Sequence, residues 1–478
     1  MKRSTDRDTL SEFSHDAGPE KVTPKEVCRA EGEDDVVALL REAWSAGSPV
    51  TPRGGGTGIP TQSVGRGVVL LQDRTKAELD GELVACQPGL VKADLNSLLA
   101  RSGLWVPVDP SSYASCTVGG MVANNSSGAR SLKYGSVGEY VAGLRAVAPG
   151  EEVAEVVPVG LDALPAEPRI ARLASILLEN RKAIEDERPR VTKNSSGYRL
   201  EKALHGATLD VPRLFVGSEG TLGVTTRVSF RTAPRPAWRI LFIVETSLAA
   251  MDKTVGAFRE HRPAALELVD KSVFRRVGKW GRVAPYSKSE EEYLLFCELD
   301  GPGTREDALE RVASSSVAGL DPTVLSDPSE IQAAWDVRNE TLSLAQGVRE
   351  GPRSLAPGVE DLVVPPERLG DLVRVLTGQF GSRGLGYIMY GHAGDANLHA
   401  RPLVDQSDLA GAKAMRGLMD ECFEAVWKMG GSMTGEHGDG RLRAPYVERQ
   451  YPRTYWIMKE VKALFDPKGV MNPGVKLI

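Results

Sequence analysis

Three of the six histidines in this 478-residue chain lie in two motifs of small residues near its end. The first motif, YGHAGDANLH over 390–399, holds His392 and His399, and the second, TGEHGDG over 434–440, holds Glu436. Neutral imidazole and carboxylate ligands together suit Zn²⁺, Mn²⁺ or Fe²⁺. Two histidines and one carboxylate leave coordination positions open, which is typical of a catalytic metal site. The motifs therefore predict a divalent cation bound by His392, His399 and Glu436.

The histidine that follows Glu436 in the second motif is assigned a different role. Neighbouring residues are poorly placed to bind the same ion, so Glu436 is the predicted ligand and His437 a general base. Imidazole suits that role because its pKa is close to neutral pH. A lone histidine is usually a hydrogen-bonded structural group, and we keep that interpretation for His15, His205 and His261.

Three segments rich in small residues predict a large polar ligand. In PRGGGTG, over 52–58, successive backbone N–H groups can point into one concavity, which suits a pyrophosphate. This loop lacks the Gly-Lys-Ser/Thr of a Walker A motif and the last glycine of GxGxxG. The segment 108–137 has too few large apolar side chains to form a core, so its polar backbone needs other partners. The third segment is VGSEGTLGVT, over 216–225.

Composition excludes several other classes of protein. The net charge of -5 provides no electrostatic footprint for nucleic acid. We find no run of about 18 apolar residues and no apolar signal segment at the start, so we expect a cytoplasmic protein, with peripheral contact at the inner face of a membrane left open. The five cysteines are far apart, which argues against disulfides and an iron–sulfur cluster. Electrons would have to leave to a separate acceptor: a quinone, a dye or a partner redox protein.

These segments need a scaffold larger than one hydrophobic core, and we expect two domains. Up to about residue 232, strands and helices alternate, as in an α+β nucleotide-binding domain; the clearest are a helix over 33–46, strands over 68–71 and 83–89, and a helix over 92–102. TAPRP, over 232–236, is typical of a linker. The order that follows resembles a ferredoxin-like half: strand 238–245, helix 248–260, strands 264–269 and 293–298, and helix 305–315. A further helix is predicted over 408–429.

In this order, and with KNSSGY over 193–198, the motifs resemble those of the vanillyl-alcohol oxidase (PCMH-type) FAD flavoproteins. Within that superfamily they are most similar to the D-lactate dehydrogenase and glycolate oxidase subunit group, from about residue 20 to the end. The resemblance implies an α+β fold in which a PCMH-type FAD-binding domain carries a cap domain with a ferredoxin-like sheet. We place the FAD domain at 1–232, the cap or substrate domain with the metal motifs at 233–440, and a segment returning to the FAD domain at 441–478.

The resemblance also assigns residues to the cofactor and the substrate. Arg338 would bind the substrate carboxylate, as a guanidinium fork suits that group. The residues expected at FAD are Arg53, Gly54, Gly55, Gly56, Thr57, Gly58, Pro110, Ser111, Thr117, Gly119, Gly120, Asn124, Ser126, Gly128, Tyr134, Glu219, Gly223, Val224 and Asn472. Some relatives attach FAD through a histidine or cysteine in the first loop, but neither occurs over 50–67, so we expect non-covalent FAD. The chain departs from the group at 59–63, IPTQS, where two more glycines are common.

We therefore expect an FAD-dependent dehydrogenase that oxidises a D-2-hydroxy acid to the 2-keto acid, with D-lactate as first choice. His437 would remove the hydroxyl proton, the metal would polarise the hydroxyl, hydride would pass to flavin N5, and the electrons would go to an acceptor other than NAD. Some relatives have a lysine shortly before the Val-Pro at 364–365, and its absence here disfavours 2-hydroxyglutarate. Glycolate or D-2-hydroxyglutarate dehydrogenase, a metal-free FAD oxidase of an alcohol or sugar, and a flavin-binding electron-transfer subunit remain the alternatives.

Overall fold

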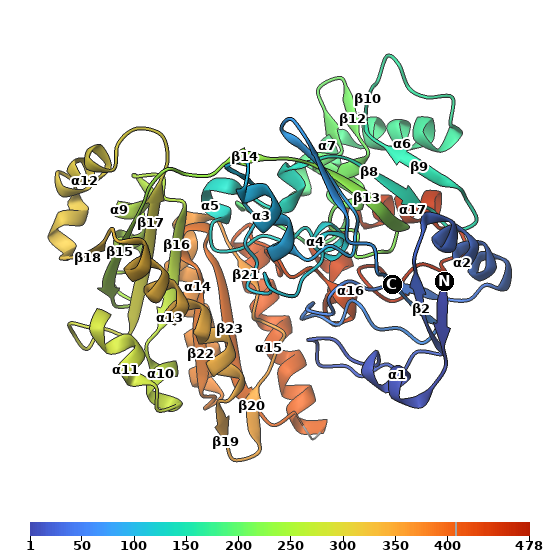
Figure 1. The fold of residues 1–478 in the computed structure, drawn as a ribbon. Helices are drawn as coiled ribbons and strands as arrows, with labels where there is room; N and C mark the ends of the chain where they lie inside the picture. Colours follow the sequence, from blue (N-terminus) through green and yellow to red (C-terminus); the bar gives the residue numbers. More distant parts are fainter. Residues whose placement is uncertain (407–408) are drawn as a thin grey trace.

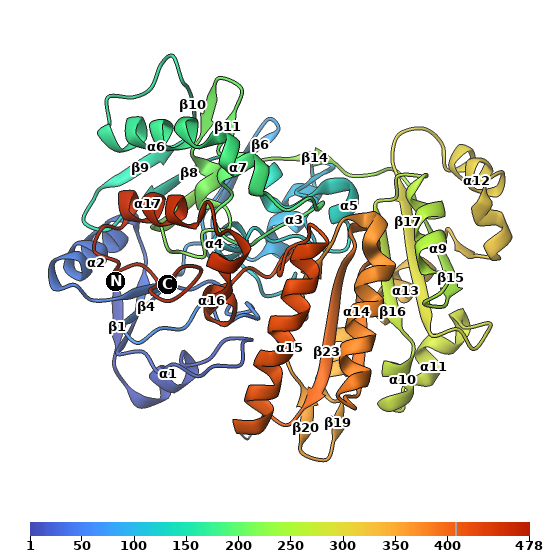
Figure 2. The same cartoon turned by 180° about the vertical axis from the view of Figure 1, so that it is seen from behind.

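The computed structural model describes residues 1–406 and 409–478, which form two adjacent α+β domains. Figure 1 shows the first domain in blue to green and the cap domain in yellow to orange. The red C-terminal segment lies back against the first domain in both views (Figures 1 and 2). This architecture confirms the predicted fold class, including the ferredoxin-like sheet of the cap.

The first domain begins with a four-stranded sheet in the order β1 (Lys2–Ser4), β2 (Glu26–Ala30), β4 (Val68–Gln72) and β3 (Val50–Pro52), in which β2, β4 and β3 are parallel. The helix α2 (Glu33–Ala46) packs on it through Val36, Leu39, Leu40 and Ala43, which recur at helical spacing. Three acidic residues occupy its first turn, and Gly47 ends it in a left-handed conformation. The predicted helix over 33–46 is confirmed.

The second sheet of this domain is antiparallel, in the order β5 (Ala77–Asp80), β6 (Leu83–Cys86), β13 (Val224–Arg231), β8 (Val141–Val147) and β9 (Val153–Val156). Alternate residues of β13 are buried, so one of its faces belongs to the core. The main helices of the domain are α1 (Arg7–Glu12), α3 (Lys92–Ala100), α4 (Val118–Asn124), α5 (Ser131–Tyr134), α6 (Pro168–Glu179), α7 (Arg181–Glu187) and α8 (Pro212–Phe215). Short strands complete it: β7 (Leu104–Trp105), β10 (Pro158–Gly160), β11 (Leu204–His205), β12 (Thr208–Asp210) and β14 (Ala233–Pro234).

The cap sheet starts with the strand order β18 (Thr323–Leu325), β15 (Arg239–Thr246), β17 (Tyr293–Asp300) and β16 (Ala265–Asp270). With α9 (Met251–Arg259) and α12 (Arg305–Ala313) in the crossovers, this is a complete ferredoxin-like unit. Beyond β16 the sheet continues with β22 (Tyr387–His392), β23 (Asn397–Val404), β20 (Arg353–Leu355) and β19 (Arg349–Glu350), while β21 (Leu362–Val363) pairs with β23. The first histidine motif, 390–399, is therefore a strand pair joined by a tight turn.

Helices cover both faces of the cap sheet (Figures 1 and 2). One face packs against α10 (Ser272–Arg276), α11 (Trp280–Val283) and α13 (Pro328–Gln346); the other packs against α9, α14 (Leu369–Ser382) and α15 (Leu409–Lys428). The predicted helix over 408–429 corresponds to α15, and residue 408 lies outside the described residues. Alternate side chains of each strand thus enter two separate cores, which fixes the face that every side chain of the sheet presents.

The C-terminal segment crosses back to the first domain through α16 (Gly440–Gln450) and α17 (Tyr455–Phe465). Its last residues pair with the first domain at an isolated bridge between Val50 and Met471. The Asn472 amide then donates to the backbone oxygens of Gln62 and Glu219, at 2.9 and 2.8 Å. These buried hydrogen bonds hold the chain end against the loop that follows the glycine-rich segment and against the segment 216–225.

The buried Lys92 at the start of α3 should make the stability of the first domain depend on pH. Its side chain is fully buried, its ammonium donates to Val106 O at 2.7 Å, and burial lowers its pKa to about 7. The unfolded chain, in which lysine has a pKa of about 10.4, therefore binds more protons between about pH 7 and 10.4, so stability rises with pH over this window. Relative to Lys92→Met, the free energy of unfolding of the wild type should rise by up to about 1.4 kcal/mol for each pH unit in this window. Denaturation of both proteins at pH 7, 8 and 9 measures it; a difference independent of pH would contradict the expectation.

Candidate active site

Three adjacent strands of the cap present the site on the face covered by α13. Glu267 lies on β16, His392 on β22 and His399 on β23, and the register pairs Tyr390 with His399. Residues two apart in a strand share a face, so Tyr390 and His392 point the same way. The tight turn over 393–396 brings the two predicted histidine ligands together from neighbouring strands.

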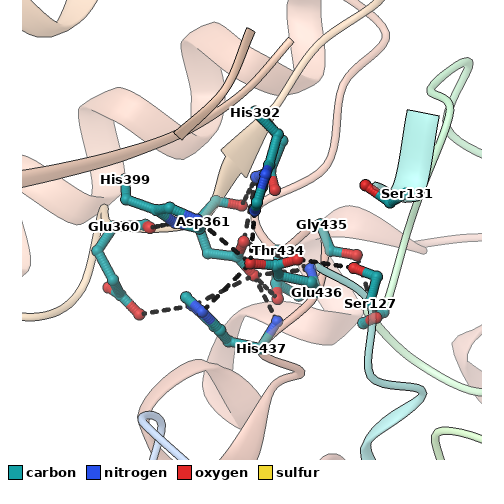
Figure 3. A network of polar contacts seen from close by, with 12 residues as sticks. Ser127, Ser131, Glu360, Asp361, His392, His399, Thr434, Gly435, Glu436 and His437 are labelled. Carbon is teal, nitrogen blue, oxygen red and sulfur yellow. Dashed lines mark hydrogen bonds and ion pairs between the residues drawn. The ribbon is translucent and has the colours of Figure 1, made fainter. Parts of the chain in front are cut away.

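Both histidines are held by their Nδ1 atoms so that their Nε2 atoms face one carboxylate (Figure 3). His392 Nδ1 is 2.8 Å from Glu267 Oε1, and His399 Nδ1 is 2.6 Å from Glu360 O. On the other side of the rings, the Nε2 atoms lie 3.0 and 3.2 Å from Glu436 Oε1. Histidine ligands of metals are ordinarily oriented in this manner, by a carboxylate or carbonyl on the second nitrogen. The donor set and its support fit a divalent cation at the three predicted ligands.

The second oxygen of Glu436 is bound by other groups. Oε2 accepts hydrogen bonds from Ser127 Oγ at 2.7 Å and from Lys193 Nζ at 3.1 Å, and so Oε1 is the oxygen that faces the histidines. Burial alone would raise the pKa of Glu436, but His392 and Lys193 outweigh it and hold that pKa well below its ordinary value. Burial also lowers the pKa of His392, but the carboxylates of Glu267 and Glu436 outweigh burial and raise that pKa to about 9. The carboxylate is therefore ionised and ready to bind a cation.

The loop 434–440 that carries Glu436 and His437 is fastened by Asp361. The Asp361 carboxylate accepts from Thr434 Oγ1 and from the backbone N–H groups of Glu436, at 3.0 Å, and His437, at 2.8 Å. It also accepts from the Asn397 amide at 3.1 Å. The ligand atoms of His399, Glu436, His437 and Asp361 lie within 4.8 Å of one another and could hold a metal ion; this group does not include His392, but it does include Asp361. Because both its oxygens are already occupied by these donors, we assign it to positioning the loop.

His437 lies beside the predicted ligands. Its ring stacks on His399 with centroids 5.0 Å apart, and its Nε2 is 3.6 Å from Glu436 Oε1. Its Nδ1 is buried without a hydrogen-bond partner, 3.7 Å from Glu360 Oε1 and 3.8 Å from Asp361 Oδ2. Burial lowers the pKa of His437, but these carboxylates outweigh it and raise that pKa above its ordinary value. The ring is thus placed to receive a proton at the site.

A cavity of about 800 Å³ in the first domain reaches this histidine cluster. It is lined by every residue predicted for FAD except Gly128, Tyr134 and Asn472, and Glu436 and His437 also line it. The glycine-rich loop forms a tight wall, because a Cβ on Gly55 would lie 2.3 Å from Ser115 O. A cavity walled by closely packed backbone fits a large polar ligand such as FAD.

The three exceptions are placed elsewhere by their contacts. Tyr134 faces the cap, where its hydroxyl donates to Asp300 at 2.8 Å. The side-chain amide of Asn472 donates to the backbone oxygens of Gln62 and Glu219. Gly128 packs against Asp109 O and lines a second cavity. Glu219 lines the first cavity, but its carboxylate accepts from the N–H groups of Asp439 and Gly440 at the start of α16.

The second cavity, of about 900 Å³, is lined by residues of both domains and shares Glu436 and His437 with the first. His392, His399, Tyr390 and Arg338 line it. Arg338 on α13 donates through Nε and Nη2 to Glu267 Oε2, at 3.0 and 2.5 Å, and both side chains are buried. The guanidinium charge is therefore matched by Glu267, which in turn orients His392. This ion pair supports the histidine cluster. The contact of Arg338 with the substrate carboxylate stays a prediction.

Sequence reasoning missed several residues of the site: Ser127, Lys193, Glu267, Asp361 and Arg401. Glu267 left a signal, since it is an acidic residue inside the apolar strand ALELVD. A fully buried carboxylate in such a strand needs a charged partner. Ser127 and Lys193 lie in segments that the sequence analysis singled out, 108–137 and 193–198, but their contact with Glu436 left no local signal because Glu436 is distant in the sequence.

Replacement of Gly55 with alanine tests the cofactor cavity. The new Cβ would meet a backbone oxygen at 2.3 Å, so the loop must move. Overpacking of this kind costs about 1–3 kcal/mol, and we expect FAD affinity to fall by roughly tenfold or more. The ratio of flavin to protein absorbance measures it. Gly378→Ala in α14, where a Cβ meets nothing within 4 Å, is the control and should retain FAD. A fully flavinated Gly55→Ala protein would contradict the placement.

Comparisons with known proteins define the class. Residues 235–475 match the family described as FAD linked oxidases, C-terminal domain, and residues 24–156 match an FAD binding domain. The chain therefore belongs to the FAD-linked oxidase family, and the predicted resemblance is confirmed. In the described part of the chain, no helix combines the length and apolar character needed to cross a bilayer.

The chain is similar over nearly its whole length to individual enzymes. The glycolate oxidase subunit GlcD of Bacillus subtilis is 28% identical, covering 97% of this chain and 91% of its own. The D-lactate dehydrogenase of Archaeoglobus fulgidus is 29% identical, covering 97% and 94%. The D-2-hydroxyglutarate dehydrogenase of Pseudomonas putida is 29% identical over 92% of this chain, which spans about half of that protein (46%). A solved alkyldihydroxyacetonephosphate synthase has the same fold, with a TM-score of 0.66 at 16% identity, over 98% of this chain and 82% of its own.

Proposed function

We propose that the protein is an FAD-dependent dehydrogenase that oxidises a small D-2-hydroxy acid, D-lactate first, with the help of a divalent cation. The observation that carries the proposal is the convergence of two imidazole Nε2 atoms and one carboxylate oxygen beside His437, where the two cavities share residues. The D-lactate dehydrogenase and the glycolate oxidase subunit among the relatives support the substrate class.

Each residue of the site has a separate role in the proposed reaction. When bound, FAD would supply the acceptor for the hydride from C2 of the substrate, and His392, His399 and Glu436 would hold a cation that supplies positive charge at the 2-hydroxyl. His437 takes the hydroxyl proton, and the nearby Glu360 and Asp361 carboxylates stabilise the resulting imidazolium. Asp361 also fixes the loop, which keeps His437 in one orientation toward the cavities.

The segment before the Val-Pro at 364–365 favours a substrate with one carboxylate. It provides Glu360, which pairs with the fully buried Arg443, and Asp361, which binds the loop 434–440. These acidic side chains offer no cation to a second carboxylate on the substrate. Among the alternatives, this favours D-lactate or glycolate over D-2-hydroxyglutarate.

A dye-reduction screen of the purified holoenzyme tests the proposal. The substrates are D- and L-lactate, glycolate, malate and D-2-hydroxyglutarate, with metal content and oxygen uptake measured on the same sample. We expect the highest kcat/KM with D-lactate. A higher value for D-2-hydroxyglutarate or glycolate would overturn the substrate choice. Oxidation of alcohols or sugars by a metal-free protein, or no flavin reduction by any 2-hydroxy acid, would overturn the function.

A further inference from the structure

Arg401 lies two residues after His399 on β23 and therefore on the same face of the cap sheet. It lines the first cavity together with Glu436 and His437. In the register of β22 and β23, Arg401 lies opposite Ile388 and His399 lies opposite Tyr390. Arg401 is thus a cationic side chain next to the histidine cluster, on the side that opens toward the flavin cavity.

Unlike the other arginines of the site, Arg401 makes no hydrogen bond or ion pair with the described residues, although its charge helps to lower the pKa of Glu360. Within residues 1–406 and 409–478, no hydrogen bond or ion pair involves it, and its Nε is buried without an acceptor. By contrast, Arg338 pairs with Glu267 and Arg443 pairs with Glu360. Glu360 is occupied further by the N–H of Gly358, which donates to its Oε2. A buried guanidinium nitrogen with no acceptor is costly, and this points to an acceptor supplied by a ligand.

The chemistry of that ligand follows from the shape and charge of the group. A guanidinium presents a planar fork of donors that matches a carboxylate in two parallel hydrogen bonds. Arg338, the arginine expected from the sequence, already donates through Nε and Nη2 to Glu267. Of the two arginines, Arg401 is the one with its donors unused at the place where the cavity meets Glu436 and His437.

We propose that Arg401 binds the C1 carboxylate of the 2-hydroxy acid and so determines specificity for an anionic substrate, while Arg338 positions His392 through Glu267. The inference rests on the proposed function, because it assigns the carboxylate of that substrate. With C1 held by Arg401, the neighbouring 2-hydroxyl is directed to the histidine cluster, where His437 can receive its proton. An alcohol of the same size without the carboxylate would lose this anchor.

The experiment compares Arg401→Met and Arg401→Lys with the wild-type holoenzyme. One readout is the ratio of kcat/KM for D-lactate to that for the neutral D-lactamide. A second readout, independent of turnover, is the Kd of pyruvate, measured by the change in flavin absorbance on titration. For Arg401→Met we expect the Kd to rise at least about tenfold, as for loss of one charge-assisted hydrogen bond, and the ratio to fall by a similar factor. FAD and metal contents should be unchanged, and Arg401→Lys should lie between the two.

Controls separate this role from a structural one. Arg374→Met removes an exposed arginine of α14 and should change nothing. Arg338→Lys should lower metal content while the preference for D-lactate over D-lactamide is retained. An unchanged Kd and ratio in flavinated Arg401→Met and Arg401→Lys would overturn the inference, and so would loss of FAD from Arg401→Lys, which would assign the group to the cofactor. Wild-type protein that oxidises no 2-hydroxy acid would overturn the proposed function itself.

Discussion

Replacing His399 with alanine is expected to remove the divalent cation and to lower kcat by at least about a hundredfold, while FAD stays bound. The imidazole is fixed by Glu360 O and faces Glu436 Oε1 at 3.2 Å, so its loss leaves only two of the three predicted ligands. A metal ion that polarises a substrate oxygen contributes several kcal/mol, and each 1.36 kcal/mol is a factor of ten in rate. Elemental analysis, flavin absorbance and dye reduction on one preparation measure the three quantities.

Two further variants make this test specific. Glu436→Gln keeps the size of the side chain and should have the same effect as His399→Ala, since it removes the charge that attracts the cation. His205→Ala changes an exposed histidine of β11 and should retain metal, FAD and rate. Chelator treatment of the wild type should reproduce the loss, and added divalent metal should reverse it. Full turnover by metal-free His399→Ala protein would refute the metal site.

Replacing His437 with alanine is expected to lower kcat by about 10²- to 10⁴-fold, the range for loss of a general base, with both FAD and metal retained. The ring lines both cavities and its Nδ1 has no hydrogen-bond partner, whereas the backbone of His437 is held independently by Asp361. The loop should therefore keep its shape without the imidazole. The rate of flavin reduction by D-lactate in a stopped-flow experiment measures the effect.

Chemical rescue distinguishes a base from a structural group at this position. Added imidazole should restore part of the rate of His437→Ala, because it can occupy the vacated space and accept the proton. Asp361→Asn provides the contrast: it weakens the anchor of the loop 434–440, and imidazole should not rescue it. A near-normal rate in His437→Ala would exclude the role of base. Loss of the metal from that variant would show instead that His437 is a ligand.

Much of the local structure could be predicted from the sequence. The helix over 33–46 was bounded correctly because its signals are local: acidic residues in the first turn, apolar residues at helical spacing, and Gly47 at its end. The strand and helix order of the cap was visible for the same reason. The strands β22 and β23 were missed, since small residues and histidines there hide the alternation that marks a strand.

By itself, the sequence determined which side chains could bind a cation and a dinucleotide, because histidine, carboxylate and glycine carry their chemistry wherever they are placed. Only the tertiary structure decided what surrounds them. Glu267 meets His392 across 125 residues of chain, and Ser127 meets Glu436 across 309. It also decided that Arg338 is held by Glu267, while the Nε of Arg401 is buried without an acceptor among the described residues. Contacts between distant segments depend on how the two domains and the C-terminal segment pack together, and no local pattern of residues encodes that packing.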